Sequence, residues 1–522
     1  MVQGRKLPIG IQDFENLRND DYIYVDKTEY IYRLVHSGKP YFLSRPRRFG
    51  KSLFLSTLRA YFEGKKGLFT GLKIMELEGD GPEAWQKYPV FYFDFNKDEY
   101  KREAAIESVL EGHLEKWEEQ YRVDKGSRSL AARFQKLIEK AYEESGKGVV
   151  VLVDEYDKAL LESDEDRLEH NKIVFKGFFS TLKSYDHYLK FVFLTGVTKF
   201  SKVSIFSDLN QLRDISLLSE YNGICGITQS ELTEHFAPEI DELALAEGID
   251  REDCLAKLKK MYDGYHFGAD TDGVYNPFGL LNVLWKKSFG LYWFATGAPT
   301  FLIEKLKQSN FDAKEITEGD LYAQESVLTD YRFDNPNPIP LFYQTGYLTI
   351  HGYDKKYRSY QLGYPNDEVK YGFLESLAPY YLCAEKEANP LDVRSFVLDI
   401  RKGNTDSLKD RFTALFARLS YPADEKAVEQ NFQNVIYIVF MLLGQYTFTE
   451  FHSAKGRADC IVETEEYVYI FEFKRDKSAE EAQQQIEDMG YAKPYAADQR
   501  RLLKIGVNFD SKERSINGWE VR

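Results

Sequence analysis

Short apolar runs, each followed by a longer stretch of helical periodicity, organise the first two hundred residues. These runs lie at Tyr41–Leu43, Pro89–Asn96, Val149–Val153 and Tyr188–Phe200. Continuous apolar runs of this length are typical of strands that are buried on both faces. Their alternation with helices predicts a parallel, doubly wound α/β sheet.

The pattern changes twice further along the chain. From about Ser216 it indicates helices with tyrosine-rich turns, and a mixed, mainly helical region with short strands at Gly346–His351 and Tyr360–Leu362 continues to about Asp410. The last hundred residues predict a helix at about Glu425–Leu443, followed by a hairpin of strands. We therefore expect an α/β domain over residues 1–215, a helical middle region over 216–410, and a second α/β domain over 411–522.

The stretch Pro40–Leu58 (PYFLSRPRRFGKSLFLSTL) combines a short strand, a basic turn and the start of a helix at Gly50, Lys51 and Ser52. Phosphate binding needs inward-pointing N–H groups at a helix start, a lysine for the phosphates and a hydroxyl for Mg²⁺. These residues predict a P-loop, although Arg45 stands where the usual pattern has its first glycine. A basic turn that binds no nucleotide is the alternative.

A second element, GVVVLVDEYDKAL, ends its apolar run at Asp154 and Glu155. A buried parallel strand delivers such carboxylates to its C-terminal end, where Asp154 can hold Mg²⁺ and Glu155 can orient or deprotonate a water molecule. The alternative is an acidic strand end that meets solvent. At the end of the next strand, the hydroxyl of Thr195 or Thr198 could hydrogen-bond a phosphate, or these residues belong to an ordinary turn.

A different set of polar residues closes the chain. Asp459 lies in GRADCIV, and Glu472 and Lys474 lie in YVYIFEFK. Because side chains alternate along a strand, Glu472 and Lys474 share one face while Phe471 and Phe473 enter the core. Two carboxylates that bind Mg²⁺ and a lysine that activates water or stabilises charge suit phosphodiester cleavage. A solvated surface strand explains the same E-x-K spacing.

The stretches RPRRFGKSLFLSTL and VVLVDEYDKAL resemble the AAA-ATPase-like family, and the C-terminal arrangement is similar to the PD-(D/E)XK nuclease superfamily. The first resemblance implies ATP and Mg²⁺ as cofactors, and the second implies metal-dependent nuclease chemistry. The middle region is then expected to contain a lid and a winged-helix-like or linker domain. The residues implied for nucleotide binding are Arg47, Arg48, Gly50, Lys51, Ser52, Asp154 and Thr195.

The resemblance also assigns metal ligands and supporting residues. The implied metal ligands are Ser52 and Asp154 at the first site, and Glu429, Asp459 and Glu472 at the second. Gln485 and Tyr491 match a helix that follows in related nucleases. Arg47, Arg48 and Arg213 are candidates for an arginine that acts on the γ-phosphate, within one chain or between subunits, with an ordinary ion pair as the alternative for each. His266 has no partner at ligand spacing and is expected to be packed or partly exposed.

Composition and charge bound these expectations. The chain has 522 residues, 43% of them hydrophobic, which is ample for packed cores. A formal net charge of -15 repels nucleic acid at long range, so any contact requires a local basic patch or a bridging metal ion. Four scattered cysteines and the lack of an apolar export or membrane segment predict a cytoplasmic location.

The expected function is ATP binding and hydrolysis coupled to a Mg²⁺-dependent nuclease domain that acts on nucleic acid, with DNA as the favoured substrate. No membrane partner is expected, and a homo-oligomer is left open. The alternative is an ATP-dependent switch or scaffold whose nuclease-fold domain binds without cutting.

Overall fold

The computed structural model describes residues 5–79, 81, 84–96, 100, 102, 104–126, 128–163, 165–199, 212–296, 302, 321–329, 337–381, 392–417, 435–444, 448–451, 458–513 and 515–522. Two compact units make up the chain. The first comprises Met1–Trp293 and Tyr322–Glu368, and the second comprises Phe294–Leu321 and Val369–Arg522. Each unit is described separately below.

The helices of the first unit fall into two groups along the chain. Those of the N-terminal part are α1 (Phe14–Asn19), α2 (Thr28–Ser37), α3 (Lys51–Phe62), α4 (Lys73–Glu78), α5 (Ala105–Tyr121), α6 (Leu130–Ser145), α7 (Lys158–Leu161), α8 (Glu165–Phe179) and α9 (Thr181–Ser184). Those that follow are α10 (Gln229–His235), α11 (Ala237–Glu247), α12 (Arg251–Tyr262), α13 (Pro277–Lys286), α16 (Glu325–Leu328) and α17 (Ile339–Thr345).

A five-stranded sheet forms the centre of the N-terminal part. Its strands, in spatial order, are β2 (Val90–Asp94), β3 (Val149–Asp154), β4 (Leu189–Gly196), β1 (Tyr41–Ser44) and β5 (Arg213–Asp214). All neighbours pair in parallel. The predicted parallel α/β sheet is therefore confirmed, and the strand order places β4 between the strand that precedes the P-loop and the strand that carries Asp154.

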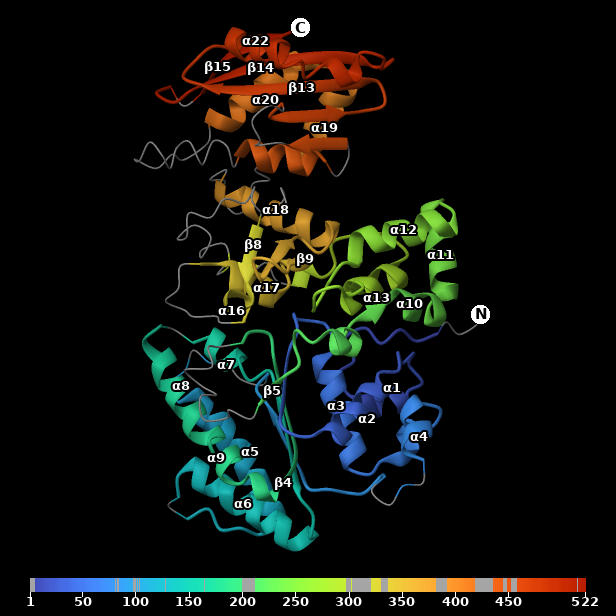
Figure 1. Cartoon of the computed structure of the whole chain (residues 1–522), viewed down its shortest axis with the longest axis vertical. Helices are drawn as coiled ribbons and strands as arrows, with labels where there is room; N and C mark the ends of the chain where they lie inside the picture. The colour runs from blue at the N-terminus through green and yellow to red at the C-terminus, as the bar shows by residue number, and fades with distance from the viewer. Residues whose placement is uncertain are drawn as a thin grey trace. The chain divides into compact units, whose positions relative to one another are not determined.

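Helices cover both faces of this sheet (Figure 1), with α1–α4 on one side and α5, α6 and α8 on the other. Phe93 of β2 packs against Trp117 of α5 at 4.9 Å and against Phe134 of α6 at 5.2 Å. On the opposite face, Phe54 of α3 lies 5.9 Å from Phe193 of β4. Every residue of β3 is buried, as its uninterrupted apolar run predicts.

The rest of the first unit contains two smaller sheets. One pairs β6 (Ile227–Thr228) with β7 (Val274–Tyr275) beside the helices α10–α13. The other has the order β8 (Leu321–Gln324), β10 (Ser359–Gly363) and β9 (Thr349–Asp354), with α16 and α17 between β8 and β9 in sequence. The expected mainly helical middle region is therefore present, and β9 and β10 overlap the two short strands that the sequence predicted.

The second unit is built on the mixed sheet of β11 (Phe448–Phe451), β12 (Cys460–Glu463), β13 (Tyr467–Arg475), β14 (Arg501–Asp510) and β15 (Ser515–Val521), in that spatial order. β13 and β14 are parallel, and the other pairs are antiparallel. Its helices with described bounds are α18 (Asp367–Tyr381, which begins in the first unit), α19 (Val393–Lys402), α20 (Thr405–Ala417) and α22 (Ala479–Met489), and residues 435–443 are also helical. None of the helices in the described ranges is long and apolar enough to cross a membrane.

Substitution of Gly196, the last residue of β4, tests how tightly this end of the strand is packed. A Cβ atom at Gly196 would lie 2.6 Å from Asp157 Oδ1 and 2.7 Å from the Tyr156 ring. We expect Gly196→Ala to lower the free energy of unfolding by about 1–3 kcal/mol, because buried neighbours must move. Gly177→Ala is the control, since a Cβ there meets nothing within 4 Å. In helix α8 it should stabilise by about 0.5–1 kcal/mol. Equal unfolding temperatures for the two variants would contradict this packing.

Candidate functional site

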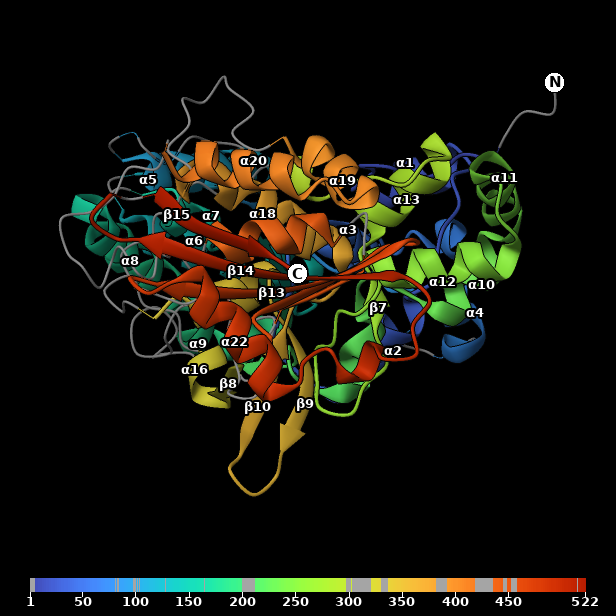
Figure 2. The same ribbon diagram turned by 90° about the horizontal axis from the view of Figure 1, so that it is seen from above.

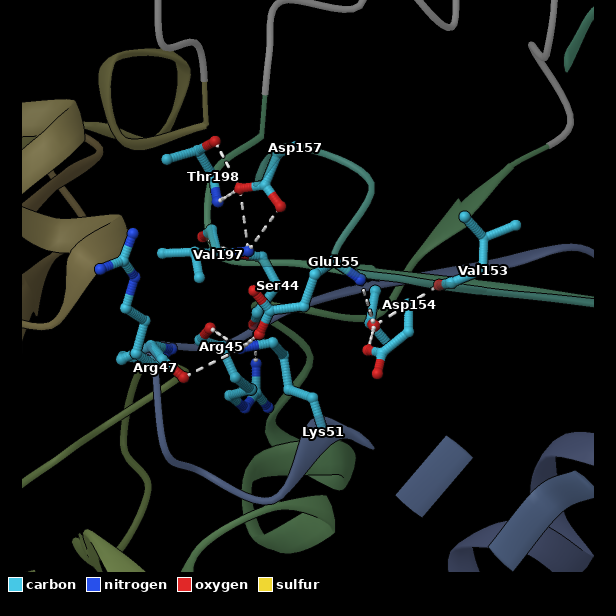
Figure 3. Close-up of polar contacts among 12 residues, drawn as sticks. Ser44, Arg45, Arg47, Lys51, Val153, Asp154, Glu155, Asp157, Val197 and Thr198 are labelled. Atoms are coloured by element: carbon cyan, nitrogen blue, oxygen red, sulfur yellow. Dashed lines mark hydrogen bonds and ion pairs between the residues drawn. The ribbon is translucent and has the colours of Figure 1, made fainter. Parts of the chain in front are cut away.

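The P-loop connects the end of β1 to the start of α3. Gly50, the residue before the helix, has φ 94°, a left-handed conformation that favours glycine. Lys51 is 3% exposed, and its Nζ donates hydrogen bonds to the carbonyl oxygens of Arg45 (3.0 Å) and Pro46 (3.1 Å). Figure 3 shows this lysine directed back toward the loop. The loop therefore curls around the lysine, as phosphate binding requires.

Arg45 fills the position of the missing glycine by a different means. Its side chain is 1% exposed and donates to three main-chain carbonyls: Ser44 (2.8 Å), Ser216 (2.8 Å) and Tyr221 (2.9 Å). The guanidinium also lies 3.9 Å from the centre of the Phe267 ring. Arg45 is thus a structural residue beneath the loop, a role that the sequence did not reveal because its acceptors lie some 170 residues away.

Asp154 lies at the C-terminal end of β3 and is 2% exposed. Because β4 lies between β1 and β3, Thr195 reaches this carboxylate and donates its hydroxyl to Oδ1 at 2.7 Å. Tyr92 donates to Oδ2 at 3.3 Å. Burial raises the pKa of Asp154, against the opposing effect of hydrogen bonds from Ser52 and Thr195. The structure therefore brings Ser52, Asp154 and Thr195 together.

Glu155 follows directly and has φ 50°, which is uncommon for a residue with a side chain. Its Oε1 lies 3.5 Å from Lys51 Nζ. The carboxylate and the lysine therefore face the same space.

Asp157 is a buried carboxylate that the sequence did not single out. It accepts hydrogen bonds from the main-chain N–H groups of Val197 (3.0 Å) and Thr198 (2.5 Å), and from the Thr198 hydroxyl (2.7 Å). Figure 3 shows this cluster beside Glu155. Asp157 therefore ties the turn after β3 to the end of β4, and Thr198 serves this link rather than facing Asp154.

A cavity of about 400 Å³ opens at the P-loop. Its polar wall includes Gly50, Lys51, Ser52 and Glu155. Asn96, Lys158 and Glu162 also line it and were not predicted. Most of the remaining wall is apolar. Its apolar residues include, from the segment before β1 and from the chain after β5, Pro8, Ile9, Ile11, Ile23, Val25, Ile224, Ile227, Phe236, Phe278 and Leu281.

The predicted arginines lie in different places. Arg47 and Arg48 are exposed and line the cavity, and neither forms an ion pair within the part of the chain that the structure describes. Arg48 lies over the Phe278 ring at 4.9 Å, whereas Figure 3 shows the Arg47 side chain turned away from Lys51. Arg213 pairs with Tyr41 at the opposite end of β1 and donates to Ser37 O. Within one chain Arg213 therefore does not face the P-loop.

His266 is partly buried, as expected. Its Nδ1 lies 2.7 Å from the carbonyl of Thr271, and its main-chain N–H donates to Thr349 Oγ1 at 2.8 Å. Both contacts are to main-chain or hydroxyl groups of the fold and indicate a structural role.

The second candidate site lies in the second unit, on β12 and β13. Cys460 pairs with Phe471, so Asp459, one residue earlier, lies beside the end of β13 and accepts the N–H of Phe473 at 2.8 Å. Lys474 Nζ donates to Glu472 Oε1 at 2.8 Å. The alternation along β13 therefore places Glu472 and Lys474 on one face, and the predicted hairpin brings Asp459 to them.

Glu472 is 2% exposed, and burial together with the Asp459 charge raises its pKa to about 7. Its Oε2 is buried and lacks a hydrogen-bond partner among the described residues. A divalent cation would satisfy this oxygen, because carboxylate oxygens are the ligands that Mg²⁺ prefers. Asp459 and Glu472 therefore fit such an ion.

The helix that follows completes this site. Lys474 Nζ also donates to Gln485 Oε1 of α22 at 2.5 Å, and Gln485 Nε2 donates to the Tyr491 hydroxyl at 3.4 Å. The expected Gln and Tyr thus lie beside the lysine. Glu429 lies outside the described residues, and no cluster of three or more His, Cys, Asp or Glu with metal-binding geometry occurs within them.

The buried Asp157 generates a prediction about pH. Burial raises its pKa to about 6, above the value near 3.9 of an unfolded chain. Between these two pH values the folded chain binds more protons, so the contribution of Asp157 to stability falls as the pH rises. Asp157→Asn should remove this component, on the order of 1 kcal/mol per pH unit. Thermal unfolding of both proteins from about pH 4 to 7 measures it, and identical pH profiles would contradict it.

Comparisons with known proteins match the two parts of the chain in which these candidate sites lie. A family model described as a predicted AAA-ATPase matches residues 8–206, and that of the PD-(D/E)XK nuclease superfamily matches residues 427–519. The uncharacterized protein in the vnfD 5' region of Azotobacter chroococcum mcd 1 is 36% identical over 536 residues, which cover 99% of each chain.

Among solved structures, the ORC2 protein of Aeropyrum pernix (ADPNP-ADP complexes) is 12% identical and covers 70% of this chain and 98% of its own, with a TM-score of 0.29. Nothing further is inferred from a similarity this low. The two family models therefore identify the chain as a member of the AAA-ATPase-like family through residues 8–206, with a C-terminal domain of the PD-(D/E)XK nuclease superfamily over residues 427–519.

Proposed function

We propose that the first unit binds and hydrolyses ATP with Mg²⁺, and that the C-terminal domain is a Mg²⁺-dependent nuclease that acts on nucleic acid, with DNA as the expected substrate. The observation that carries the ATP proposal is that Lys51, Ser52 and Glu155 line one cavity whose remaining wall is largely apolar. A nucleotide has the same division, because a charged phosphate chain is joined to a flat, largely apolar base.

Each residue has a role in this proposal. The N-terminal N–H groups of α3 and the Lys51 ammonium neutralise the phosphates. Ser52 and Asp154 would hold Mg²⁺, which supplies charge neutralisation between the phosphate groups. Thr195, bonded to Asp154, lies where a γ-phosphate would be sensed, and Glu155 orients the attacking water. Arg48 lies over the Phe278 ring and lines the cavity. It is the proposed arginine that acts on the γ-phosphate.

In the C-terminal domain, Asp459 and Glu472 would hold the metal ion, which supplies Lewis-acid stabilisation of the phosphate. Lys474 lies between Glu472 and Gln485, where its ammonium can stabilise charge that develops on the phosphate or activate water. The unsatisfied Glu472 Oε2 supports this assignment. We retain Glu429 as a proposed further ligand.

A hydrogen-bonded path supports coupling between the two activities. The Trp293 indole donates to the carbonyl of Arg47 at 3.1 Å, and the Trp293 main-chain N–H donates to Glu368 Oε1 at 2.6 Å. Glu368 lies in the first turn of α18, which starts in the first unit and continues into the second. A change in the P-loop on nucleotide binding would therefore be transmitted to the start of the helix that leads to the nuclease domain.

The division of the chain into domains at residues 215 and 410, the homo-oligomer and the cytoplasmic location remain parts of this proposal.

Loss of the P-loop lysine tests the ATP proposal. Lys51→Ala should weaken ATP–Mg²⁺ binding by about 10- to 100-fold, because a charge-assisted hydrogen bond contributes about 1.5–3 kcal/mol. Calorimetric titration of the full chain measures it. Lys66→Ala removes an exposed lysine outside the cavity and should leave the affinity unchanged. A flat titration of the unsubstituted chain would instead indicate a P-loop that binds no nucleotide.

Cleavage of labelled DNA and RNA in Mg²⁺ or Mn²⁺, with and without ATP, tests the nuclease proposal. Asp459→Asn and Lys474→Met should each slow cleavage by about 100-fold or more, since the first removes a charged ligand of the proposed metal ion and the second removes the ammonium that stabilises charge on the reacting phosphate. Glu480→Gln, at an exposed position of α22, is the control and should cleave normally.

Cleavage that persists in Asp459→Asn would overturn the assignment of this site. ATP turnover without cleavage under any condition would favour the switch or scaffold, whose nuclease-fold domain binds but does not cut.

A further inference from the structure

The hairpin of β9 and β10 ends in a basic and aromatic tip that has no assigned role. Four consecutive residues, Lys355, Lys356, Tyr357 and Arg358, form the turn, and all four are exposed. The Asp354 carboxylate accepts the N–H groups of Lys356 (2.8 Å) and Tyr357 (3.1 Å), which holds the turn in a defined shape. The tip is therefore an ordered structure.

The positive charges of the tip are not neutralised. Lys355, Lys356 and Arg358 form no ion pair within the described ranges, and Asp354, the only acidic residue between 349 and 363, is occupied by main-chain N–H groups. Some other lysines of this unit are instead paired with glutamates: Lys125 with Glu115, Lys136 with Glu139 and Lys140 with Glu144. In a chain of net charge -15, the tip is thus a local concentration of unpaired cations.

An exposed aromatic ring accompanies these charges. Tyr357 is 65% exposed, and Lys356 Nζ lies 5.0 Å from its ring centre. A large ring left in water beside cations suits stacking on a base or a sugar, since stacking tolerates any sequence. Behind it, Tyr353 and Tyr360 pack at 4.8 Å across the two strands and stiffen the ribbon.

The shape of the hairpin agrees with this chemistry. Figure 2 shows β9 and β10 extending outward as a two-stranded ribbon, past α16 and β8 of the same unit. A ribbon of two strands fits the major groove of duplex DNA, and lysine and arginine bind the flanking phosphates.

The base of this module rests on the P-loop. Gly346, which ends α17 just before β9, packs so closely that a Cβ there would lie 2.7 Å from Pro46 Cβ. Gln344 Oε1 accepts the N–H of Lys199, three residues after the end of β4, at 2.8 Å. A change in the conformation of the P-loop would thus alter the packing at the start of the hairpin.

We propose that residues 355–358 form a duplex-DNA contact, in which Lys355, Lys356 and Arg358 bind phosphates and Tyr357 stacks against the DNA. This contact supplies the grip that the acidic C-terminal segment lacks, since residues 424–522 hold 13 Lys and Arg against 18 Asp and Glu. The inference rests on the proposed function, because it takes nucleic acid as the substrate.

The test measures binding of a labelled DNA duplex by fluorescence anisotropy over a series of salt concentrations. The parent is the full-length chain with Asp459→Asn, which prevents cleavage. The hairpin variant adds Lys355→Gln, Lys356→Gln and Arg358→Gln to this parent. A second variant adds only Tyr357→Ala to the parent. The control variant instead adds Lys125→Gln, Lys136→Gln and Lys140→Gln, which remove the same charge from glutamate-paired positions.

We expect the hairpin variant to bind about 10- to 100-fold more weakly and to lose about 2–3 from the slope of log affinity against log salt, as for three lost phosphate contacts. Tyr357→Ala should weaken binding by about 10-fold. The control should bind like the parent. The changed residues of the hairpin, Lys125 and Lys136 are exposed and Lys140 is half-buried, so unfolding temperatures should stay close to that of the parent.

Unchanged affinity of the hairpin variant, or equal loss in the control, would overturn the contact while leaving the proposed function intact. A hairpin variant that loses affinity for RNA or single strands but not for the duplex would also overturn the contact. So would displacement of the labelled duplex from the parent by polyglutamate as readily as by unlabelled DNA. If the parent binds no nucleic acid and the unsubstituted chain cleaves none, the proposed nuclease function fails instead.

Discussion

The buried guanidinium of Arg45 is the interaction on which the first unit depends. A P-loop ordinarily uses glycine at this position so that the backbone can turn tightly. Here a charged side chain passes beneath the loop and binds three main-chain carbonyls, one from the adjacent Ser44 and two from the segment after β5. Burial lowers its pKa to about 10, which leaves it protonated at neutral pH. Hydrogen bonds to these carbonyls, together with the Phe267 ring, offset the loss of solvation.

Because Arg45 fixes the conformation of the loop, the loop residues next to it are held where they contact other parts of the first unit. The carbonyls of Arg45 and Pro46 hold Lys51, Pro46 packs on Gly346, and the carbonyl of Arg47 accepts the Trp293 indole. A glycine-rich loop makes few such contacts. In this chain the loop therefore contacts three parts of the first unit: the cavity at the P-loop, the segment that leads into the β9–β10 hairpin and, through Trp293, the start of α18.

The second unit depends on a different constraint, the register of β12 and β13. Pairing of Cys460 with Phe471 sets Asp459 beside Glu472 and buries both Phe471 and an unsatisfied carboxylate oxygen. A shift of one residue would turn Glu472 and Lys474 to the opposite face and place the phenylalanines in their position. The packing of Phe471 and Phe473 against Phe440, at 4.9 and 5.9 Å, opposes such a shift.

The sequence by itself determined the features that depend on near neighbours. Apolar runs predicted β1–β4, the Gly50-Lys51-Ser52 turn predicted the start of α3, and strand alternation placed Glu472 with Lys474. Each follows from backbone periodicity or turn chemistry over a few residues, which the local sequence encodes.

Only the tertiary structure decided which distant groups meet. The position of β4 between β1 and β3 brought Thr195 to Asp154, and the fold turned Arg45 into a structural residue and Arg213 away from the P-loop. Likewise, Asp157 acquired its role from the backbone of β4, forty residues away. Such pairings depend on how strands order and pack across long loops. That order is set by the burial of whole faces, and no short pattern records it.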